Sequence, residues 1–164
     1  MYKKILVPLD GSDLAECVFA HVQTITRGCS SIPEVVFVRA WKPFHEEGYP
    51  SMGMMGGSEA GISDQQVSKH YDTAVKAAAE KYLQEVVSKN KIDNVKVRTE
   101  VLMGNPADVI AEYANENEFD LIVIATHGRS GASRWVWGST ADRILRSVCV
   151  PVMMVRSPGC VLGI

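Results

Sequence analysis

The chain has 164 residues, of which 46% are hydrophobic and 22% are charged, a composition typical of a single globular domain. The formal net charge is −2, so the chain lacks the basic field that would attract nucleic acid or an anionic membrane. No apolar run reaches the roughly 18 residues that a membrane-spanning helix needs, and the apolar start of the chain stops at Pro8 without a signal-peptide cleavage pattern. We therefore expect a cytoplasmic protein.

Residues 1–43 predict two buried strands and the helix between them. The aliphatic residues 5–7 form a strand that runs into a turn, and Ser12 in this turn is suited to begin a helix that Gly28 ends. The apolar residues of this helix recur every three or four positions, at Leu14, Val18, Val22 and Ile25. Residues 35–38 are β-branched or aromatic throughout, which is typical of a strand buried on both faces.

Residues 44–63 form a segment without periodicity. The segment contains five glycines and three methionines, which predicts a flexible surface loop. Exposed methionines adapt to varied surfaces, so a loop that contacts a partner is one alternative. A metal site built from His45, Glu46, Glu47 and the methionines is another, but nothing in their spacing fixes a coordination geometry.

The remainder of the chain predicts a long helix and then alternating strands and helices. The long helix follows Asp64, and its apolar stripe comprises Val67, Tyr71, Val75, Ala78, Tyr82 and Val86. Residues 95–101 alternate between apolar and polar, as in a strand with one solvated face. Four further elements complete the order: a helix beginning at Asn105-Pro106, a buried strand at 121–125, a helix beginning at Ser139 and a strand at 150–155.

Strands that alternate with helices form a mainly parallel sheet with helices on both faces. The fully apolar strands at 5–7 and 121–125 belong in the middle, and the alternating strand at 95–101 belongs at an edge. We therefore predict one α/β domain over residues 1–157, a doubly wound five-stranded parallel sheet in the order 3-2-1-4-5, followed by a tail at 158–164. The last strand then lies at the other edge, where unpaired backbone groups invite pairing with a second copy.

Two segments meet where the winding of such a sheet reverses, which is where open α/β sheets bind ligands. The first strand leads into residues 8–12, and the fourth leads into a glycine-rich segment that opens a helix. Phosphate binding needs backbone amides without a nearby Cβ and the positive end of a helix. This segment supplies close approach of the backbone through Gly128, Gly131 and Gly138, and the start of a helix through Ser139 and Thr140. Arg129 adds a positive charge within reach of an anion. An ordinary glycine-rich connection with a serine cap is the alternative, since neither a Walker lysine nor a GxGxxG pattern is present.

Four segments carry a recognisable pattern: IVIATHGRSG at 122–131, the Gly138-Ser139 pair, VPV at 150–152 and the opening KILVPLDGS at 4–12. Together these segments closely resemble the universal stress protein family. The nucleotide-binding branch of that family carries the motif G-x-x-G-x9-G-[ST]. Its positions fall on Ala125, Gly128, Gly138 and Ser139, so that alanine replaces the first glycine and adds one methyl group near the ligand.

The resemblance implies a site for an adenine nucleotide, ATP or AMP, with adenine and ribose near Pro8, Asp10 and Ala40 and with phosphates on the glycine-rich segment. Mg²⁺ would bind through the phosphates. The candidate nucleotide-binding residues are Pro8, Leu9, Asp10, Ala40, Ala125, Gly128, Arg129, Gly131, Gly138, Ser139 and Thr140. For Asp10, a hydrogen bond to the nucleoside, a structural role in the turn and a catalytic role are all open at this point.

The function implied is that of a regulatory or sensing module in stress response, at most a slow ATPase, and a homodimer joined through the last strand. No catalytic residue is assigned, because no Ser-His-Asp or Cys-His arrangement surrounds His127. One alternative is a dimeric stress protein that binds no nucleotide and acts through protein partners. Another is an enzyme of a related nucleotide-using fold, which would need extra glycines after the first strand.

Overall fold

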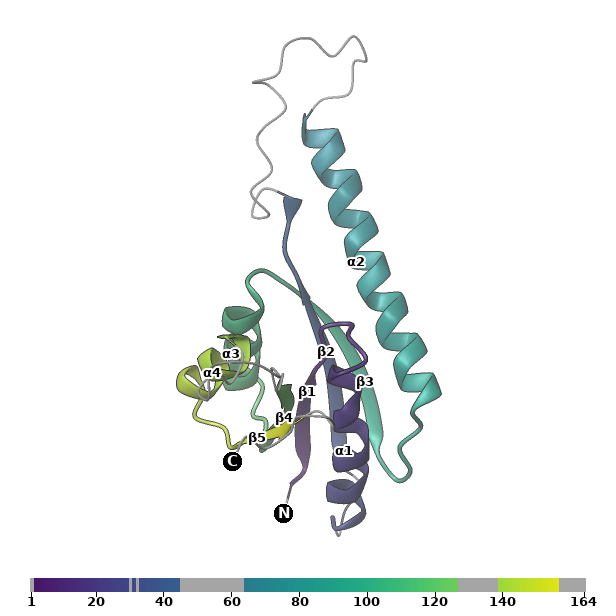
Figure 1. The fold of residues 1–164 in the computed structure, drawn as a ribbon, viewed down its shortest axis with the longest axis vertical. Coiled ribbons are helices and arrows are strands. Elements are labelled where there is room, and N and C mark those ends of the chain that lie inside the picture. Colours follow the sequence, from purple (N-terminus) through teal and green to yellow (C-terminus); the bar gives the residue numbers. More distant parts are fainter. Residues whose placement is uncertain (1, 30, 32, 45–63, 127–138, 157–164) are drawn as a thin grey trace, which may run out of the picture.

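The computed structural model describes residues 2–29, 31, 33–44, 64–126 and 139–156, and it shows a layered α/β fold (Figure 1). Five parallel strands form one sheet in the order β3-β2-β1-β4-β5, which confirms the predicted topology. The elements are β1 (Lys4–Pro8), the 3-10 helix η1 (Ala15–Cys17), α1 (Val18–Arg27), β2 (Glu34–Trp41), α2 (Asp64–Lys89), β3 (Lys96–Met103), α3 (Pro106–Glu116), β4 (Leu121–Thr126), α4 (Ser139–Ser147) and β5 (Val152–Arg156).

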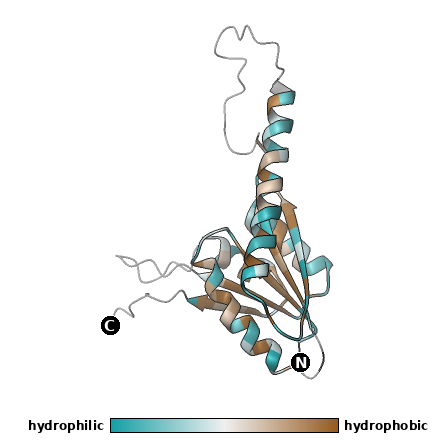
Figure 2. Cartoon of the chain, turned by 90° about the vertical axis from the view of Figure 1, so that its right-hand side faces the viewer, coloured by the Kyte–Doolittle hydropathy of each residue, from teal (hydrophilic) through white to brown (hydrophobic). Residues whose placement is uncertain are grey.

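Apolar side chains of the central strands fill both faces of the sheet. On one face, α1 and α2 cover a core that includes Val7, and the rings of Phe19 and Phe37 stack there with centroids 4.9 Å apart. On the other face, α3 and α4 cover a second core that includes Leu6 and Ile144. Each such buried side chain contributes roughly 1.5–3 kcal/mol relative to an exposed one. Figure 2 shows this distribution, with hydrophobic residues concentrated in the strands.

The helix after β1 begins later than its apolar pattern predicts. Its first turn is the 3-10 helix η1, in which the amide of Ala15 donates to the carbonyl of Ser12 at 3.0 Å and that of Cys17 donates to Leu14. A 3-10 turn advances each side chain further around the axis than an α-turn does. As a result Leu14 is 42% exposed and does not join the apolar face, whereas Val18 is fully buried as predicted.

The predicted apolar stripe of α2 lies on the less exposed side of the helix, with one exception. In the stripe, Val86 is buried and four residues are half-buried, Val67, Tyr71, Val75 and Tyr82. Ala78 is exposed and its neighbour Ala79 is buried instead, and Leu83, which the stripe does not include, is fully buried against the sheet. The first half of the helix extends beyond the sheet (Figure 1), which explains why its part of the stripe is only half-buried. The ring of Phe44 contacts Tyr71 in this half, with centroids 5.3 Å apart. The loop predicted at 44–63 lies, beyond Phe44, outside the described residues.

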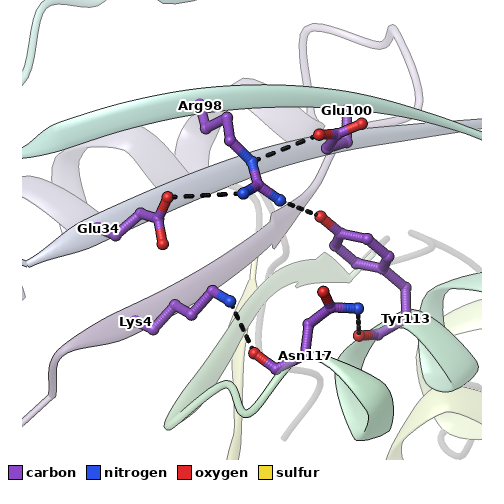
Figure 3. A network of polar contacts seen from close by, with 6 residues as sticks. All are labelled: Lys4, Glu34, Arg98, Glu100, Tyr113 and Asn117. Atoms are coloured by element: carbon purple, nitrogen blue, oxygen red, sulfur yellow. Dashed lines mark hydrogen bonds and ion pairs between the residues drawn. The ribbon is translucent and has the colours of Figure 1, made fainter.

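Polar side chains join α3 to three strands of the sheet (Figure 3). Arg98 on β3 donates a hydrogen bond to the hydroxyl of Tyr113 and lies 3.4 Å from Glu100 and 3.8 Å from Glu34. On β1, the ammonium of Lys4 donates to a carbonyl just beyond α3, that of Asn117, at 2.7 Å. Arg98 and Glu100 of the edge strand therefore lie on the face of the sheet that α3 covers.

Asp120 anchors the start of β1 beside the start of β4. Its Oδ2 accepts the backbone amides of Lys3 at 2.7 Å and Lys4 at 2.8 Å, and these two hydrogen bonds lower the pKa of the carboxyl group. Because the folded-state pKa is the lower one, the stabilisation is complete above the unfolded-state pKa of about 4 and is lost as the pH falls through the folded-state value.

Replacing Asp120 by asparagine is expected to lower the free energy of unfolding by about 1 kcal/mol at neutral pH, because two charge-assisted bonds at an exposed site become neutral ones. The difference from the parent should shrink below about pH 4, where the native carboxyl group also becomes protonated. Urea unfolding at neutral and acidic pH measures both effects. Asp93→Asn is the control, since no hydrogen bond to the Asp93 carboxylate is found in the described part of the chain. A pH-independent difference would contradict this account.

Candidate functional site

The chain leaves β1 and β4 toward opposite faces of the sheet, an arrangement that in doubly wound folds forms a crevice at the carboxyl edge. α1 leads from β1 toward β2 on one face, and α4 leads from β4 toward β5 on the other. β1 and β4 are direct neighbours, with Ile5 opposite Leu121 in the register. This is the switch point at which doubly wound sheets bind ligands, and it is the position that the sequence predicts.

The turn after β1 presents Asp10 to solvent in a fixed orientation. Its Oδ1 accepts the amide of Ser12 at 2.9 Å and the hydroxyl of Ser12 at 2.6 Å. The Ser12 oxygen in turn accepts the amide of Ala15 at 3.2 Å. Oδ2 of Asp10 receives no hydrogen bond from the described part of the chain. The turn therefore uses one carboxylate oxygen for its own structure and leaves the other for an external donor.

The neighbouring candidate residues divide between the two faces of the sheet. Ala40 packs with the α3–α4 core, and Pro8, which alternates with the core residues Val7 and Leu9, shares that face. Ala125 packs with the α1–α2 core instead, and Leu9 is buried within it at 4% exposure. The amide of Leu9 also donates to the carbonyl of Val38 at 2.8 Å. Of the polar groups of Leu9, only the carbonyl is left for a ligand.

α4 begins at the same edge of the sheet with two exposed hydroxyl residues, Ser139 and Thr140. The first turn of a helix has amides without intrahelical partners and a partial positive charge, both of which favour an anion. The guanidinium of Arg143 lies 2.9 Å from Asp108, and this pair fixes α4 beside the first turn of α3. The other residues predicted for the phosphates, Gly128, Arg129, Gly131 and Gly138, lie outside the described residues.

Arg39, Gly11 and Tyr82 form a contact behind the Asp10 turn that the sequence pattern did not reveal. The guanidinium of Arg39 lies over the ring of Tyr82, 4.7 Å from its centroid, and against the backbone of Gly11. Burial first, and then the charge of Glu16, raises the pKa of Tyr82 to about 12. The sequence signal is weak: Arg39 is a charged residue inside the otherwise apolar run 35–41 of β2.

Within the described ranges, no cluster of three or more histidine, cysteine, aspartate or glutamate side chains is arranged to hold a metal ion. Among the same residues, no helix combines the length and the apolar character needed to cross a membrane. The polar groups established above at the carboxyl edge include the exposed carboxylate of Asp10 and the hydroxyls and amides at the start of α4. Such groups hydrogen-bond a sugar and an anionic group.

Comparison with known sequences places the chain in a family. The model of the universal stress protein family matches residues 1–156. Among curated proteins, the universal stress protein MJ0531 of Methanocaldococcus jannaschii is 31% identical over 158 residues, which cover 96% of this chain and 84% of that protein.

Several solved structures share the fold. The protein MJ0577 of the same organism superposes with a TM-score of 0.73 at 20% identity, over 97% of this chain and 99% of the other. A universal stress protein in complex with cAMP gives 0.64 at 18% identity, over 94% and 97%. A family member from Arabidopsis thaliana with AMP bound gives 0.59 at 15% identity, over 96% and 93%. At these identities the likeness shows a shared fold alone.

Proposed function

Because this chain belongs to the universal stress protein family, we propose that it binds an adenine nucleotide, ATP or AMP, at the carboxyl edge of its sheet. The observation that carries the proposal is the exposed Asp10 with one free carboxylate oxygen, held at the switch point between β1 and β4. A ribose hydroxyl is a suitable donor to such an oxygen. Two fold neighbours, one in complex with cAMP and one with AMP bound, support this ligand class.

In the proposed complex, the nucleoside lies beside Asp10, with Pro8 and the small Ala40 on the face that α3 and α4 cover. The phosphates lie at the start of α4 on Ser139 and Thr140. The glycine-rich segment contributes through Gly128, Gly131 and Gly138, with Arg129 supplying a positive charge and Ala125 in the place of the first motif glycine. Mg²⁺, where present, is held mainly by the phosphates, because the described residues offer no carboxylate cluster.

We propose a regulatory or sensing role in stress response rather than rapid catalysis. The chain has no Walker lysine, which in P-loop enzymes stabilises the charge that develops during phosphoryl transfer. ATP hydrolysis, if it occurs, is therefore expected to be slow. The proposal also places the protein in the cytoplasm, where adenine nucleotides are abundant.

The most direct test is to denature the purified protein, identify any released nucleotide by chromatography and mass, and titrate the emptied protein by calorimetry. Ser139→Ala is expected to weaken ATP binding about tenfold to a hundredfold, because one hydrogen bond to a charged group contributes roughly 1.5–3 kcal/mol. Asp10→Ala should reduce the preference for adenine over other nucleosides more than it reduces affinity for the phosphates. Failure of the emptied parent to bind any adenine nucleotide at millimolar concentration would reject the proposal.

Two matched controls keep this titration specific. Ser147→Ala removes a hydroxyl at the opposite end of α4, and Asp93→Ala removes a carboxylate from an exposed turn distant from the crevice. Both variants should bind like the parent. Equal losses in Ser139→Ala and Ser147→Ala would show that the helix as a whole, rather than its first turn, determines affinity.

We further propose that the protein is a homodimer that pairs through β5. This strand lies at the edge of the sheet, hydrogen-bonded on one side to β4, with Val152, Met153 and Met154 half-buried in the single chain. An edge strand offers unpaired backbone groups on its other side. A two-fold axis would pair β5 with its own copy, so that the same residues contribute from both chains.

A further inference from the structure

Arg39 has no conventional ionic partner in the described part of the chain. It is half-buried near the end of β2, and within that part no hydrogen bond or ion pair involves its guanidinium. Its contacts are the ring of Tyr82 on α2, 4.7 Å from the guanidinium carbon, and the backbone of Gly11. A planar cation in this position fills the space between α2 and the turn after β1.

The contact with Gly11 leaves no room between the guanidinium and the turn. A Cβ atom built on Gly11 would lie 2.8 Å from Nη2 and 3.0 Å from Cζ of Arg39. The backbone of Gly11 has φ +89°, in the region that side chains other than glycine rarely adopt. The turn therefore rests directly on the guanidinium, one residue from Asp10 and one from Ser12.

Tyr82 contributes its ring rather than its hydroxyl. The hydroxyl oxygen is buried and has no hydrogen-bond partner among the described residues. A buried hydroxyl without a partner is an energetic cost, so the stacking of the ring on Arg39 is the favourable part of the contact. Because Tyr82 belongs to α2, Arg39 connects that helix to the turn after β1.

We infer that Arg39 is a positioning residue of the nucleotide site: held between Tyr82 and Gly11, its guanidinium fixes the turn that presents Asp10. Arg39 lies on the face of the sheet covered by α1 and α2, whereas Ala40 lies on the opposite face. It therefore supports the turn from behind and is not itself expected to touch the nucleotide. The part of the inference that concerns affinity rests on the proposed function.

Titration calorimetry with ATP tests the role in binding. Arg39→Gln and Tyr82→Leu should each weaken binding about fivefold, within the range for loss of a cation–π contact. Tyr82→Phe keeps the ring and removes only the unpartnered hydroxyl, so it should retain most of the parent's affinity and should not lower the Tm. Arg27→Gln, an exposed arginine at the end of α1, is the matched control and should bind like the parent.

Leu83→Ala separates positioning from general loss of stability. Leu83 is fully buried next to Tyr82 in the sequence, and its truncation creates a cavity that lowers the Tm. It should nevertheless bind ATP more tightly than Tyr82→Leu does. Equal ATP affinities in these two variants would overturn the inference. It would also be overturned if the parent binds ATP and Arg39→Gln binds it equally tightly.

Hydrogen exchange without nucleotide distinguishes failure of this inference from failure of the proposed function. The amide of Ser12 donates to Asp10 and reports the order of the turn. Its exchange should be several-fold faster in Arg39→Gln than in the parent, and unchanged in Arg27→Gln. If the parent binds no nucleotide but this acceleration is seen, the proposed function fails and the support of the turn by Arg39 stands. Unchanged exchange in Arg39→Gln rejects the support itself.

Discussion

Replacing Gly138 by valine is expected to abolish adenine-nucleotide binding and to leave the fold intact. Gly138 directly precedes Ser139, the first residue of α4, and in the proposed complex phosphate oxygens approach the backbone there. The branched side chain of valine would occupy that space and separate the phosphates from their donors. Loss of two charge-assisted hydrogen bonds amounts to about 3–6 kcal/mol, which is more than about a hundredfold in affinity. Titration calorimetry with ATP measures it.

Gly28→Val is the matched control for this substitution. Gly28 caps α1 with φ −81°, and the atom nearest to an added Cβ is a carbonyl oxygen at 3.4 Å, so a side chain fits there. The next residue, Cys29, contacts the carbonyl of Tyr2, which places this position at the amino edge of the sheet, away from the crevice. Circular dichroism should show both variants folded. Parent-like binding by Gly138→Val would show that the phosphates bind elsewhere.

The order of the sheet was predictable because the strands differ in composition. Residues 5–7 of β1 and 121–125 of β4 are apolar throughout, which suits strands buried on both faces, whereas β3 carries Arg98 and Glu100 and lies at an edge. The switch point between β1 and β4 follows from that order alone. The position of Asp10 at the crevice could therefore be predicted before any contact was known.

Other features depend on contacts that a periodic pattern does not contain. The 3-10 turn before α1 turns Leu14 outward, although its spacing fits an α-helical stripe. Ala78 and Ala79 are both compatible with burial on α2, and only the position of the sheet selects Ala79. The stack of Arg39 on Tyr82 joins residues 43 positions apart in the sequence. Such a pair leaves no signal in the local sequence, because an arginine at position 39 does not require a tyrosine at position 82.

Met153→Asp is expected to convert the proposed dimer into a folded monomer. Met153 is the second residue of β5, where it packs partly against the α1–α2 core, and β5 is an edge strand. In a two-fold dimer through β5, the substitution would place two carboxylates near each other in a mainly apolar interface. Charged side chains are a common means by which edge strands avoid pairing, and burial of an unpaired charge adds a further cost. Analytical ultracentrifugation at micromolar concentration gives the oligomeric state.

Met103→Asp provides a control at the opposite edge of the same sheet. Met103 ends β3 and is 63% exposed, so the same change of side chain introduces a charge at an edge that the proposed dimer does not use. This variant should remain dimeric, and circular dichroism should show a parent-like spectrum for both variants. Because Met153 also touches the core, some loss of thermal stability in Met153→Asp is expected and does not decide the matter. A monomeric parent, or a Met153→Asp variant that sediments as a dimer, would exclude pairing through β5. Dissociation by Met103→Asp alone would instead assign the interface to β3.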